Sequence, residues 1–287
     1  MTATTVSTAE VRKFDRMAAR WWDPRGPMRP LHRMNPARIG WIDDVLGKHR
    51  LGRHAVSGHV SGEPSLGGPA PGQQPPGQQP PDQQPPGQQP PGQRGHLLDV
   101  GCGAGLAAEA LARLGYDVLG IDAAGEAIAA ARAHAEGNES ERGNDPGDEP
   151  RLTVRYREAV AEDLSGEGLR FPAITALEVI EHVPDPAAFV RVLAGLLAPG
   201  GVLLMSTLNR TPRSFVTAKL GAEYVLRMLP VGTHDWRAFI TPKELAGMMR
   251  AAGLRVADSA GLVMDPLTGQ WRTSRDMGVN YLMAGVI

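Results

Sequence analysis

The sequence predicts an α/β fold, a doubly wound and mostly parallel sheet that follows an N-terminal helical segment. From residue 97 onward, short apolar runs alternate with segments of helical periodicity, which is typical of such sheets. The first apolar run leads directly into a glycine-rich turn, and acidic residues close several of the runs. Such sheets bind ligands at the carboxyl ends of their strands. We therefore expect Asp99, Asp122 and Glu178, which fall at these ends, to lie along one edge of the sheet.

The predicted elements follow one another in regular order. Helices are expected where apolar residues recur at helical spacing, and Pro186 suits the first turn of one of them. The run Pro199-Gly200-Gly201 should end that helix. The expected strands cover 97–100, 118–121, 152–156, 173–177, 202–206, 255–258 and 262–264, and the expected helices cover 106–114, 126–134, 186–197 and 242–252.

Composition divides the chain into three parts. Residues 1–56 contain a candidate helical lid, whose tryptophans either pack it onto the sheet or cover a ligand. Residues 57–95 repeat a Pro-Gly-Gln-Gln-Pro unit and carry too little apolar surface to offset chain entropy, so we expect an extended or disordered insertion. Residues 96–287 form the α/β domain, in which 137–150 is expected to be a loop and about 210–236 a cover segment.

The glycine-rich turn, 101–105, indicates a cofactor that contains a nucleoside. Glycine lets a backbone approach a ligand closely, so Gly101 and Gly103 are candidate contacts, and Asp122 is placed to accept hydrogen bonds from ribose hydroxyls. The spacing is G-x-G-x-G, whereas the dinucleotide fingerprint is G-x-G-x-x-G. Asp99 would repel a pyrophosphate but suits a ligand with an ammonium and a sulfonium, which favours S-adenosylmethionine over NAD. A turn without any ligand is the remaining alternative.

Several further runs resemble the ubiquinone biosynthesis O-methyltransferases. The glycine turn by itself indicates only a methyltransferase, whereas the tryptophan pair and the Leu-His-Arg-x-Asn-Pro run are much more specific. The similarity covers nearly the whole chain apart from the two polar insertions. The matching runs include Arg20-Trp21-Trp22-Asp23, Leu31-His32-Arg33-Met34-Asn35-Pro36, Glu178-Val179-Ile180-Glu181-His182, Thr207-Leu208-Asn209-Arg210 and Val279-Asn280-Tyr281.

The resemblance implies a Rossmann-like class I methyltransferase fold with a seven-stranded sheet and an N-terminal helical lid. It also implies methyl transfer from S-adenosylmethionine to a phenolic hydroxyl of a polyprenylated ubiquinone precursor. Carried over by position, Arg38 would clamp the methionine carboxylate, and Leu177 would line the adenine side unless it is an ordinary core residue. The alternatives are another small phenol as substrate, an NAD-dependent oxidoreductase, and a non-catalytic scaffold.

Glu178, Glu181 and His182 are spaced i, i+3 and i+4, so a helical turn would point all three in one direction. Two carboxylates and an imidazole are typical ligands of a divalent metal, and the related methyltransferases with this pattern suggest Mg²⁺, which would lower the pKa of the phenol. Alternatively, His182 acts as a general base that Glu181 or Asp185 orients. In a third interpretation, the acids only cap the helix that begins near Pro186.

Composition also indicates which partners the protein binds and in which cellular compartment it is expected. The net charge of −1, from 30 basic and 31 acidic residues, gives no bulk attraction to nucleic acid. A single cysteine excludes an internal disulfide and fits a reducing cytoplasm, and we see neither a secretory signal nor an apolar run that could span a membrane. The apolar and basic stretch at about 210–236 suggests peripheral contact with anionic lipids at the inner face of the membrane.

Overall fold

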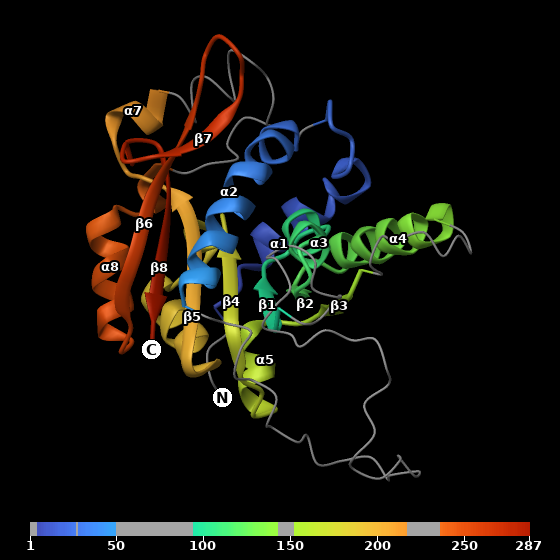
Figure 1. The fold of residues 1–287 in the computed structure, drawn as a ribbon, viewed down its shortest axis with the longest axis horizontal. Helices are drawn as coiled ribbons and strands as arrows, with labels where there is room; N and C mark the ends of the chain where they lie inside the picture. Colours follow the sequence, from blue (N-terminus) through green and yellow to red (C-terminus); the bar gives the residue numbers. More distant parts are fainter. Residues whose placement is uncertain (1–4, 27, 50–93, 143–151, 217–235) are drawn as a thin grey trace, which may run out of the picture.

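The computed structural model describes residues 5–26, 28–49, 94–142, 152–216 and 236–287 (Figure 1). At its centre is an eight-stranded sheet with the strand order β3-β2-β1-β4-β5-β8-β6-β7. The strands from β3 to β5 in that order pair in parallel, and β8, β6 and β7 complete the sheet in antiparallel pairs. The strands are β1 (His96–Val100), β2 (Asp117–Asp122), β3 (Val154–Glu158), β4 (Phe171–Leu177), β5 (Leu197–Leu208), β6 (Arg255–Met264), β7 (Trp271–Ser274) and β8 (Asn280–Val286).

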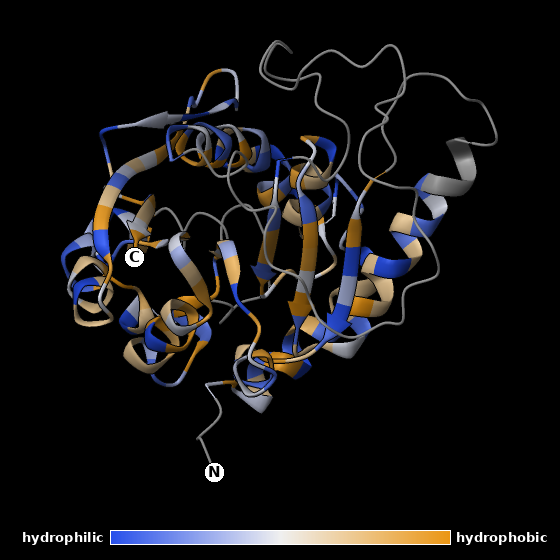
Figure 2. Ribbon diagram, turned by 60° about the horizontal axis from the view of Figure 1, so that its bottom comes forward, coloured by the Kyte–Doolittle hydropathy of each residue, from blue (hydrophilic) through white to orange (hydrophobic). Residues whose placement is uncertain are grey.

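Helices cover both faces of this sheet. Successive strand residues point to opposite faces, so the neighbours Leu97 and Leu98 of β1 belong to two different cores. One core is shared with α2, α3 and α4, and the other with α5, α6 and α8, while apolar residues dominate the central strands (Figure 2). The helices are α1 (Thr8–Asp15), η1 (Ala18–Arg20), α2 (Arg29–Lys48), α3 (Leu106–Arg113), α4 (Gly125–Arg142), α5 (Ala161–Gly166), η3 (Ile180–His182), α6 (Pro186–Gly195), α7 (Pro212–Ser214), η5 (Trp236–Ala238) and α8 (Pro242–Ala251).

The predicted α/β fold is confirmed, with the correction that the sheet has eight strands rather than seven. The runs 255–258 and 262–264 form one strand, β6, and the segments 271–274 and 280–286 add β7 and β8. Gly261 interrupts the apolar pattern but not the strand. The backbone of Asp276 approaches so closely that a Cβ at Gly261 would lie 1.8 Å from the Asp276 carbonyl oxygen. A glycine within a strand often marks such a close approach.

Two element boundaries and one additional helix also differ from the prediction. Helix α4 continues to residue 142, so the first part of the expected loop 137–150 is helical, and α5 was not predicted at all. The run Pro199-Gly200-Gly201 lies inside β5 instead of ending a helix. Gly200 has a φ of 75°, and the register between β4 and β5 shifts at Phe171, so the strand accommodates the turn residues as an irregularity.

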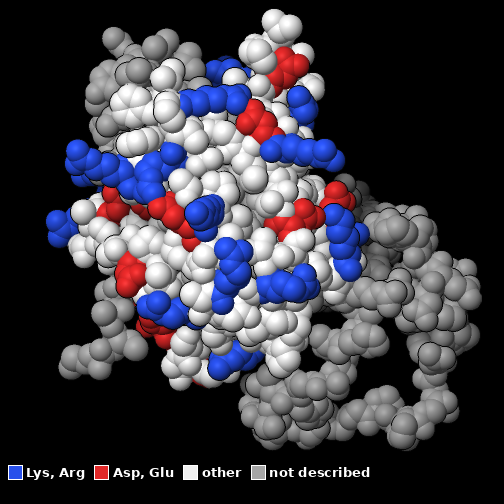
Figure 3. Space-filling view, turned by 90° about the vertical axis from the view of Figure 1, so that its left-hand side faces the viewer, with Lys and Arg blue, Asp and Glu red and all other residues white. Residues whose placement is uncertain are grey.

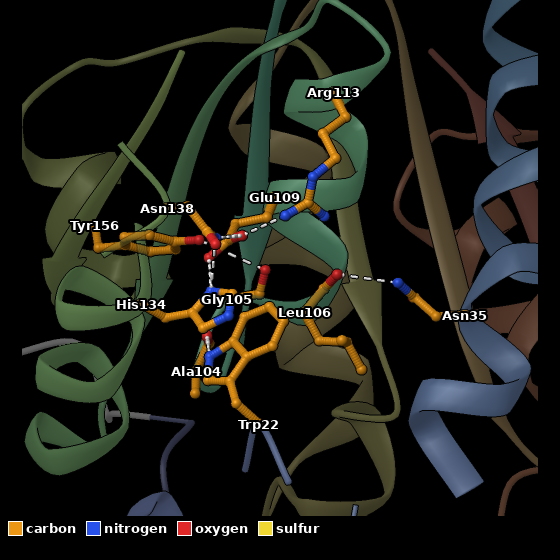
Figure 4. A network of polar contacts seen from close by, with 10 residues as sticks. All are labelled: Trp22, Asn35, Ala104, Gly105, Leu106, Glu109, Arg113, His134, Asn138 and Tyr156. Carbon is orange, nitrogen blue, oxygen red and sulfur yellow. Dashed lines mark hydrogen bonds and ion pairs between the residues drawn. The ribbon is translucent and has the colours of Figure 1, made fainter. Parts of the chain in front are cut away.

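A polar and aromatic network connects the N-terminal elements to α3, α4 and the glycine turn (Figure 4). The Trp22 ring stacks on His134 of α4 with centroids 3.4 Å apart, and its Nε1 donates to the Ala104 carbonyl oxygen at 2.9 Å. His134 Nδ1 lies 2.7 Å from Oε1 of the fully buried Glu109. Asn35 of α2 donates from Nδ2 to a carbonyl oxygen at the start of α3, 3.0 Å away. Trp22 therefore packs the N-terminal segment onto α4 and the glycine turn, whereas the sequence interpretation placed it on the sheet.

Two sequence predictions fall largely on residues that the structure does not describe. Of the insertion 57–95, only the last two residues are described, and of the cover segment at about 210–236, only 210–216 and 236. Within the described ranges, no helix is long and apolar enough to cross a membrane.

Candidate active site

The glycine-rich turn after β1 has the tight geometry that its sequence predicts. Gly101 and Gly103 adopt positive φ angles of 69° and 53°, which glycine tolerates without strain. A Cβ at Gly101 would lie 2.4 Å from Cγ2 of Val179, and one at Gly103 would lie 2.3 Å from Cζ2 of Trp21. The sequence interpretation assigned this close approach to a cofactor. In the structure, side chains of the protein itself approach the turn, so the two glycines are also required for packing.

Asp122 ends β2 beside this turn. Its Oδ2 accepts a hydrogen bond from the Gly103 N–H at 2.8 Å, and its Oδ1 accepts one from the Ala124 N–H at 2.8 Å. Burial raises the pKa of Asp122, and these backbone donors oppose that shift. Each carboxylate oxygen has a second lone pair, so Asp122 can also accept hydrogen bonds from a ligand in the cavity that it lines.

Asp99 and Arg38 are buried opposite charges next to the site. Asp99 Oδ1 accepts a hydrogen bond from Thr175 Oγ1 at 2.7 Å, and Arg38 Nη2 donates to Asn35 Oδ1 at 2.9 Å. Among the described residues, however, Asp99 Oδ2 and Arg38 Nε have no hydrogen-bond partner. Burial raises the pKa of Asp99 to about 6 and lowers the pKa of Arg38. Buried polar groups are normally satisfied, so this unpaired acceptor and this unpaired donor are exceptions in the described part of the chain.

Glu178 and Glu181 follow β4, but not on the helical turn that we expected. Glu178 has a left-handed φ of 57°, and the chain then forms only the short η3, so the predicted i, i+3, i+4 face does not arise. Strand β5 holds both carboxylates instead. Ser206 Oγ donates to Glu178 Oε1 and Thr207 Oγ1 donates to Glu181 Oε2, each at 2.8 Å. Burial, and secondarily the charge of Glu178, raises the pKa of Glu181 to about 7.

His182 receives a partner from the N-terminal helix α1, which sequence reasoning missed. Its Nδ1 lies 2.8 Å from Oε2 of Glu10, and the ring of Phe14 meets the imidazole edge-on, with centroids 5.3 Å apart. The hydrogen bond with His182 lowers the pKa of Glu10 to about 2. Glu10 lies more than 170 residues from His182 in the chain, and no local pattern in the sequence links them.

The other acids near His182 have separate contacts. Asp185 Oδ1 accepts a hydrogen bond from the Ala188 N–H at 2.9 Å and caps α6, so the capping interpretation holds for Asp185. The capping interpretation is wrong for Glu178 and Glu181, whose carboxylates bond to β5. Over the described part of the chain, no group of three or more His, Cys, Asp and Glu side chains is arranged to hold a metal ion.

A single cavity of about 410 Å³ connects most of these residues. Its wall is built by the N-terminal helices, the glycine turn, the ends of β2 and β4, and the far end of the sheet. Leu177, the last residue of β4, lines the cavity and also packs in the core, so both of its expected roles are structurally compatible. Arg38 and Asp99 lie outside the lining, whereas the predicted residues in the lining are Gly101, Gly103, Asp122, Leu177, Glu178, Glu181 and His182.

The fold and the site together define a class of enzyme. A family model described as "Methyltransferase domain" matches residues 84–259. The fold is similar to a solved structure described as "Conversion of a Disulfide Bond into a Thioacetal Group during Echinomycin Biosynthesis", with 23% identity and a TM-score of 0.50 over 67% of this chain and 75% of that chain. The chain is therefore an S-adenosylmethionine-dependent methyltransferase of the Rossmann-like class.

Sequence relatives then narrow the class to one family. The ubiquinone biosynthesis O-methyltransferase of Azorhizobium caulinodans is 42% identical, over 98% of this chain and 94% of the relative. That of Cereibacter sphaeroides is also 42% identical, over 100% of this chain and 99% of the relative. The chain belongs to the ubiquinone biosynthesis O-methyltransferase family. The resemblance is thus confirmed, and the oxidoreductase and scaffold alternatives are set aside.

Proposed function

We propose that this enzyme transfers a methyl group from S-adenosylmethionine to a phenolic hydroxyl of a polyprenylated ubiquinone precursor. The observation that carries the proposal is that one cavity unites the His182–Glu10 pair with Asp122 and the glycine turn. The cavity thereby offers acceptors for a nucleoside together with an imidazole that can take a proton from a phenol. The names of the full-length relatives support this class of substrate.

We assign parts of the cofactor to residues that can accept a hydrogen bond, provide an apolar surface, or have an unpaired polar atom. We assign the ribose hydroxyls to Asp122 and the apolar side of the adenine to Leu177, both of which line the cavity. We assign the ammonium of the methionine moiety to Asp99 and its carboxylate to Arg38. The unpaired Oδ2 and Nε of these two residues support that assignment. Both residues lie behind the cavity lining, so the assignment requires the wall in front of them to open when the cofactor binds.

His182 is the proposed general base. With Nδ1 donating to Glu10, the neutral imidazole carries its lone pair on Nε2, which can accept the phenol proton. The phenol oxygen attacks the methyl carbon as the bond between that carbon and sulfur breaks, and the electron pair of this bond stays on sulfur. Glu10 stabilises the resulting imidazolium. Because a phenol has a pKa of ~10, removal of its proton requires such help at neutral pH.

We propose that two carboxylates bind Mg²⁺, whereas the sequence analysis expected three protein ligands. Mg²⁺ is commonly held by one or two carboxylates together with substrate oxygens and water. Glu178 and Glu181 fit that pattern. Hydrogen bonds from β5 keep the two carboxylates in place, and a cation between them would offset the repulsion of their charges. His182, which we predicted as a third ligand, is bonded to Glu10 and is assigned to proton transfer instead. When bound, Mg²⁺ would supply Lewis acidity that lowers the pKa of the phenol.

Removal of divalent ions should reveal this role. We expect EDTA to lower kcat by at least about tenfold and Mg²⁺ to restore it, because the phenolate is otherwise stabilised only by the protein. Glu178→Gln should abolish the restoration. Glu167→Gln, which changes an exposed glutamate paired with Arg157, is the matched control and should respond like the wild type. Equal rates in EDTA and in Mg²⁺ would remove the metal from the proposal.

The substrate assignment is tested by direct methyl transfer. Purified enzyme is incubated with S-adenosylmethionine carrying a labelled methyl group and with a polyprenylated catechol, and the product is identified by mass spectrometry. We expect methylation of a ring hydroxyl. If the enzyme binds S-adenosylhomocysteine but methylates only phenols without a tail, the acceptor is another small phenol, and the proposed substrate is wrong.

Peripheral membrane contact from the cytoplasm is proposed as well, since a polyprenylated substrate partitions into lipid. The apolar and basic segment that suggested it lies mostly outside the described residues. Figure 3 shows Lys and Arg side chains interspersed with Asp and Glu over the face on the side of α8 and β6. Several of these cations are paired, such as Arg210 with Glu244 and Arg213 with Asp276, so the proposal rests on the lipid solubility of the substrate and not on a basic patch.

A further inference from the structure

The cavity extends far beyond the residues assigned to the cofactor. Asp122 at the end of β2 lines one part of it, and Met264 at the end of β6 and Trp271 at the start of β7 line another. In the sheet order, β2 and β7 are six strand spacings apart, which corresponds to roughly 25–30 Å along the sheet. Glu178, at the end of β4, lies between them in that order. A cofactor seated at β2 with its reacting methyl near β4 therefore leaves the part near β7 for the methyl acceptor.

The part of the cavity near β7 is chemically distinct from the part near β2. Close to β2, the lining combines the Asp122 carboxylate and backbone groups with apolar side chains such as Trp21 and Ala123. Around the start of β7, the lining side chains carry no charge and are apolar apart from Asn280. They come from α2, β5, β6, β7 and the residues that lead into β8. This apolar subsite consists of Leu31, Met34, Leu208, Met264, Trp271 and Val279.

The hairpin between β6 and β7 opens this apolar subsite to the surface. Met264 and Trp271 are register partners in the last pair of the hairpin, so their side chains are neighbours. Met264 is 48% exposed although it lines the cavity, and Leu267 at the hairpin turn is 95% exposed. A single exposed leucine is ordinary on a protein surface. Here, however, the exposed Met264 is itself part of the apolar cavity wall, and Leu267 follows it three residues later in the hairpin turn.

The hairpin turn is ordered, so it presents Leu267 in a defined place. Asp265 Oδ1 accepts a hydrogen bond from the Leu267 N–H at 2.8 Å, and the Asp265 carbonyl oxygen accepts one from the Gly269 N–H at 2.8 Å. Gly269 has a φ of 68°, and the guanidinium of Arg33 from α2 lies against it. The hairpin is thereby braced by the lid helix that also lines the cavity.

We propose that the apolar subsite and the β6–β7 hairpin bind the isoprenoid tail of the methyl acceptor and lead it out of the cavity, with Met264 as the residue at its exit. This inference rests on the proposed function and adds the location of the tail. A long branched hydrocarbon matches an elongated channel without charged lining groups, because only apolar burial contributes to its binding.

The test compares two acceptors that share the same catechol ring, one with a long isoprenoid tail and one without a tail. We expect Met264→Gln to raise KM for the tailed acceptor about five- to tenfold, because a polar amide replaces the apolar contact that Met264 makes with the bound tail. KM for the acceptor without a tail and the affinity for S-adenosylhomocysteine should stay unchanged. Ile287→Gln is the matched control, since Ile287 is 49% exposed and lies outside the cavity lining.

The alternative outcomes separate this inference from the proposed function. If the wild type methylates the tailed acceptor and Met264→Gln leaves both KM values unchanged, the tail binds elsewhere and the inference is wrong. If Met264→Gln weakens both acceptors equally and also changes the oligomeric state by light scattering, the hairpin contacts a second copy of the chain, and the inference is again wrong. If the wild type methylates neither acceptor, the proposed substrate is wrong, and so is the inference about the tail.

Discussion

Replacing His182 by glutamine is expected to lower kcat by about 10²–10⁴-fold, because proton removal from the phenol then loses its general base. The affinity for S-adenosylhomocysteine should remain, since the imidazole is assigned to the acceptor and not to the cofactor. Glu10→Gln should have a smaller effect, of about 10–10²-fold, because the ring persists but loses the carboxylate that orients it. Initial rates at saturating cofactor, together with calorimetric titrations, measure both effects.

The acidity of the acceptor distinguishes lost proton transfer from lost structure. A nitro-substituted catechol is largely ionised at neutral pH, so the deficit of the His182→Gln enzyme should shrink with it, whereas a misfolded enzyme would fail with every acceptor. His96→Gln is the matched control, because His96 is an exposed histidine that pairs with Asp117 at the start of β1 and β2. A His182→Gln enzyme with the kcat of the wild type would refute the base assignment.

Replacing Asp122 by alanine is expected to weaken binding of S-adenosylhomocysteine by about 10–100-fold. Hydrogen bonds to a charged group contribute ~1.5–3 kcal/mol, and each 1.4 kcal/mol corresponds to about a factor of ten in affinity. Part of the loss arises indirectly, because Asp122 also holds the N–H groups of Gly103 and Ala124. Calorimetric titration of the purified variant measures the change.

Two companion variants separate the direct effect from the indirect one. Asp122→Asn keeps an acceptor oxygen for the backbone but loses the negative charge, so its affinity should lie between those of the wild type and Asp122→Ala. Asp258→Ala removes a half-buried aspartate that pairs with Lys48 outside the cavity lining, and it should bind like the wild type. Unchanged affinity in Asp122→Ala would mean that the ribose is held by other residues.

Local sequence patterns predicted the fold well where the periodicity was clear. The strands from β1 to β5 and the helix beginning at Pro186 occur where alternation of apolar runs placed them, with boundaries shifted by a few residues. The pattern failed at residues 259–261, which separated two expected strands, whereas β6 runs through them and Gly261 makes room for the backbone of Asp276. It also failed at Glu178, whose left-handed conformation prevents the helical turn that the spacing suggested.

The sequence predicted those residues of the candidate site that come directly after a strand or end one. Gly101, Asp122 and Glu178 line the same cavity because the carboxyl ends of parallel strands share one edge. Ser206 and Thr207, which hold the two glutamates, lie inside β5 and carry no local signal of such a role. Side-chain partners across a sheet depend on strand order and register, which a single sequence does not specify.

The sequence by itself determined the class of fold and the cofactor type, because short-range spacing fixes a glycine turn and the acids that follow strands. The family followed from the resemblance of longer runs, such as the tryptophan pair and the Leu-His-Arg-x-Asn-Pro run. Only the tertiary structure decided that Glu10 pairs with His182 and that the β6–β7 hairpin lines the cavity. The physical reason is that these contacts join segments far apart in the chain. The packing of the lid and the order of the strands set such distances, and these are properties of the whole folded molecule.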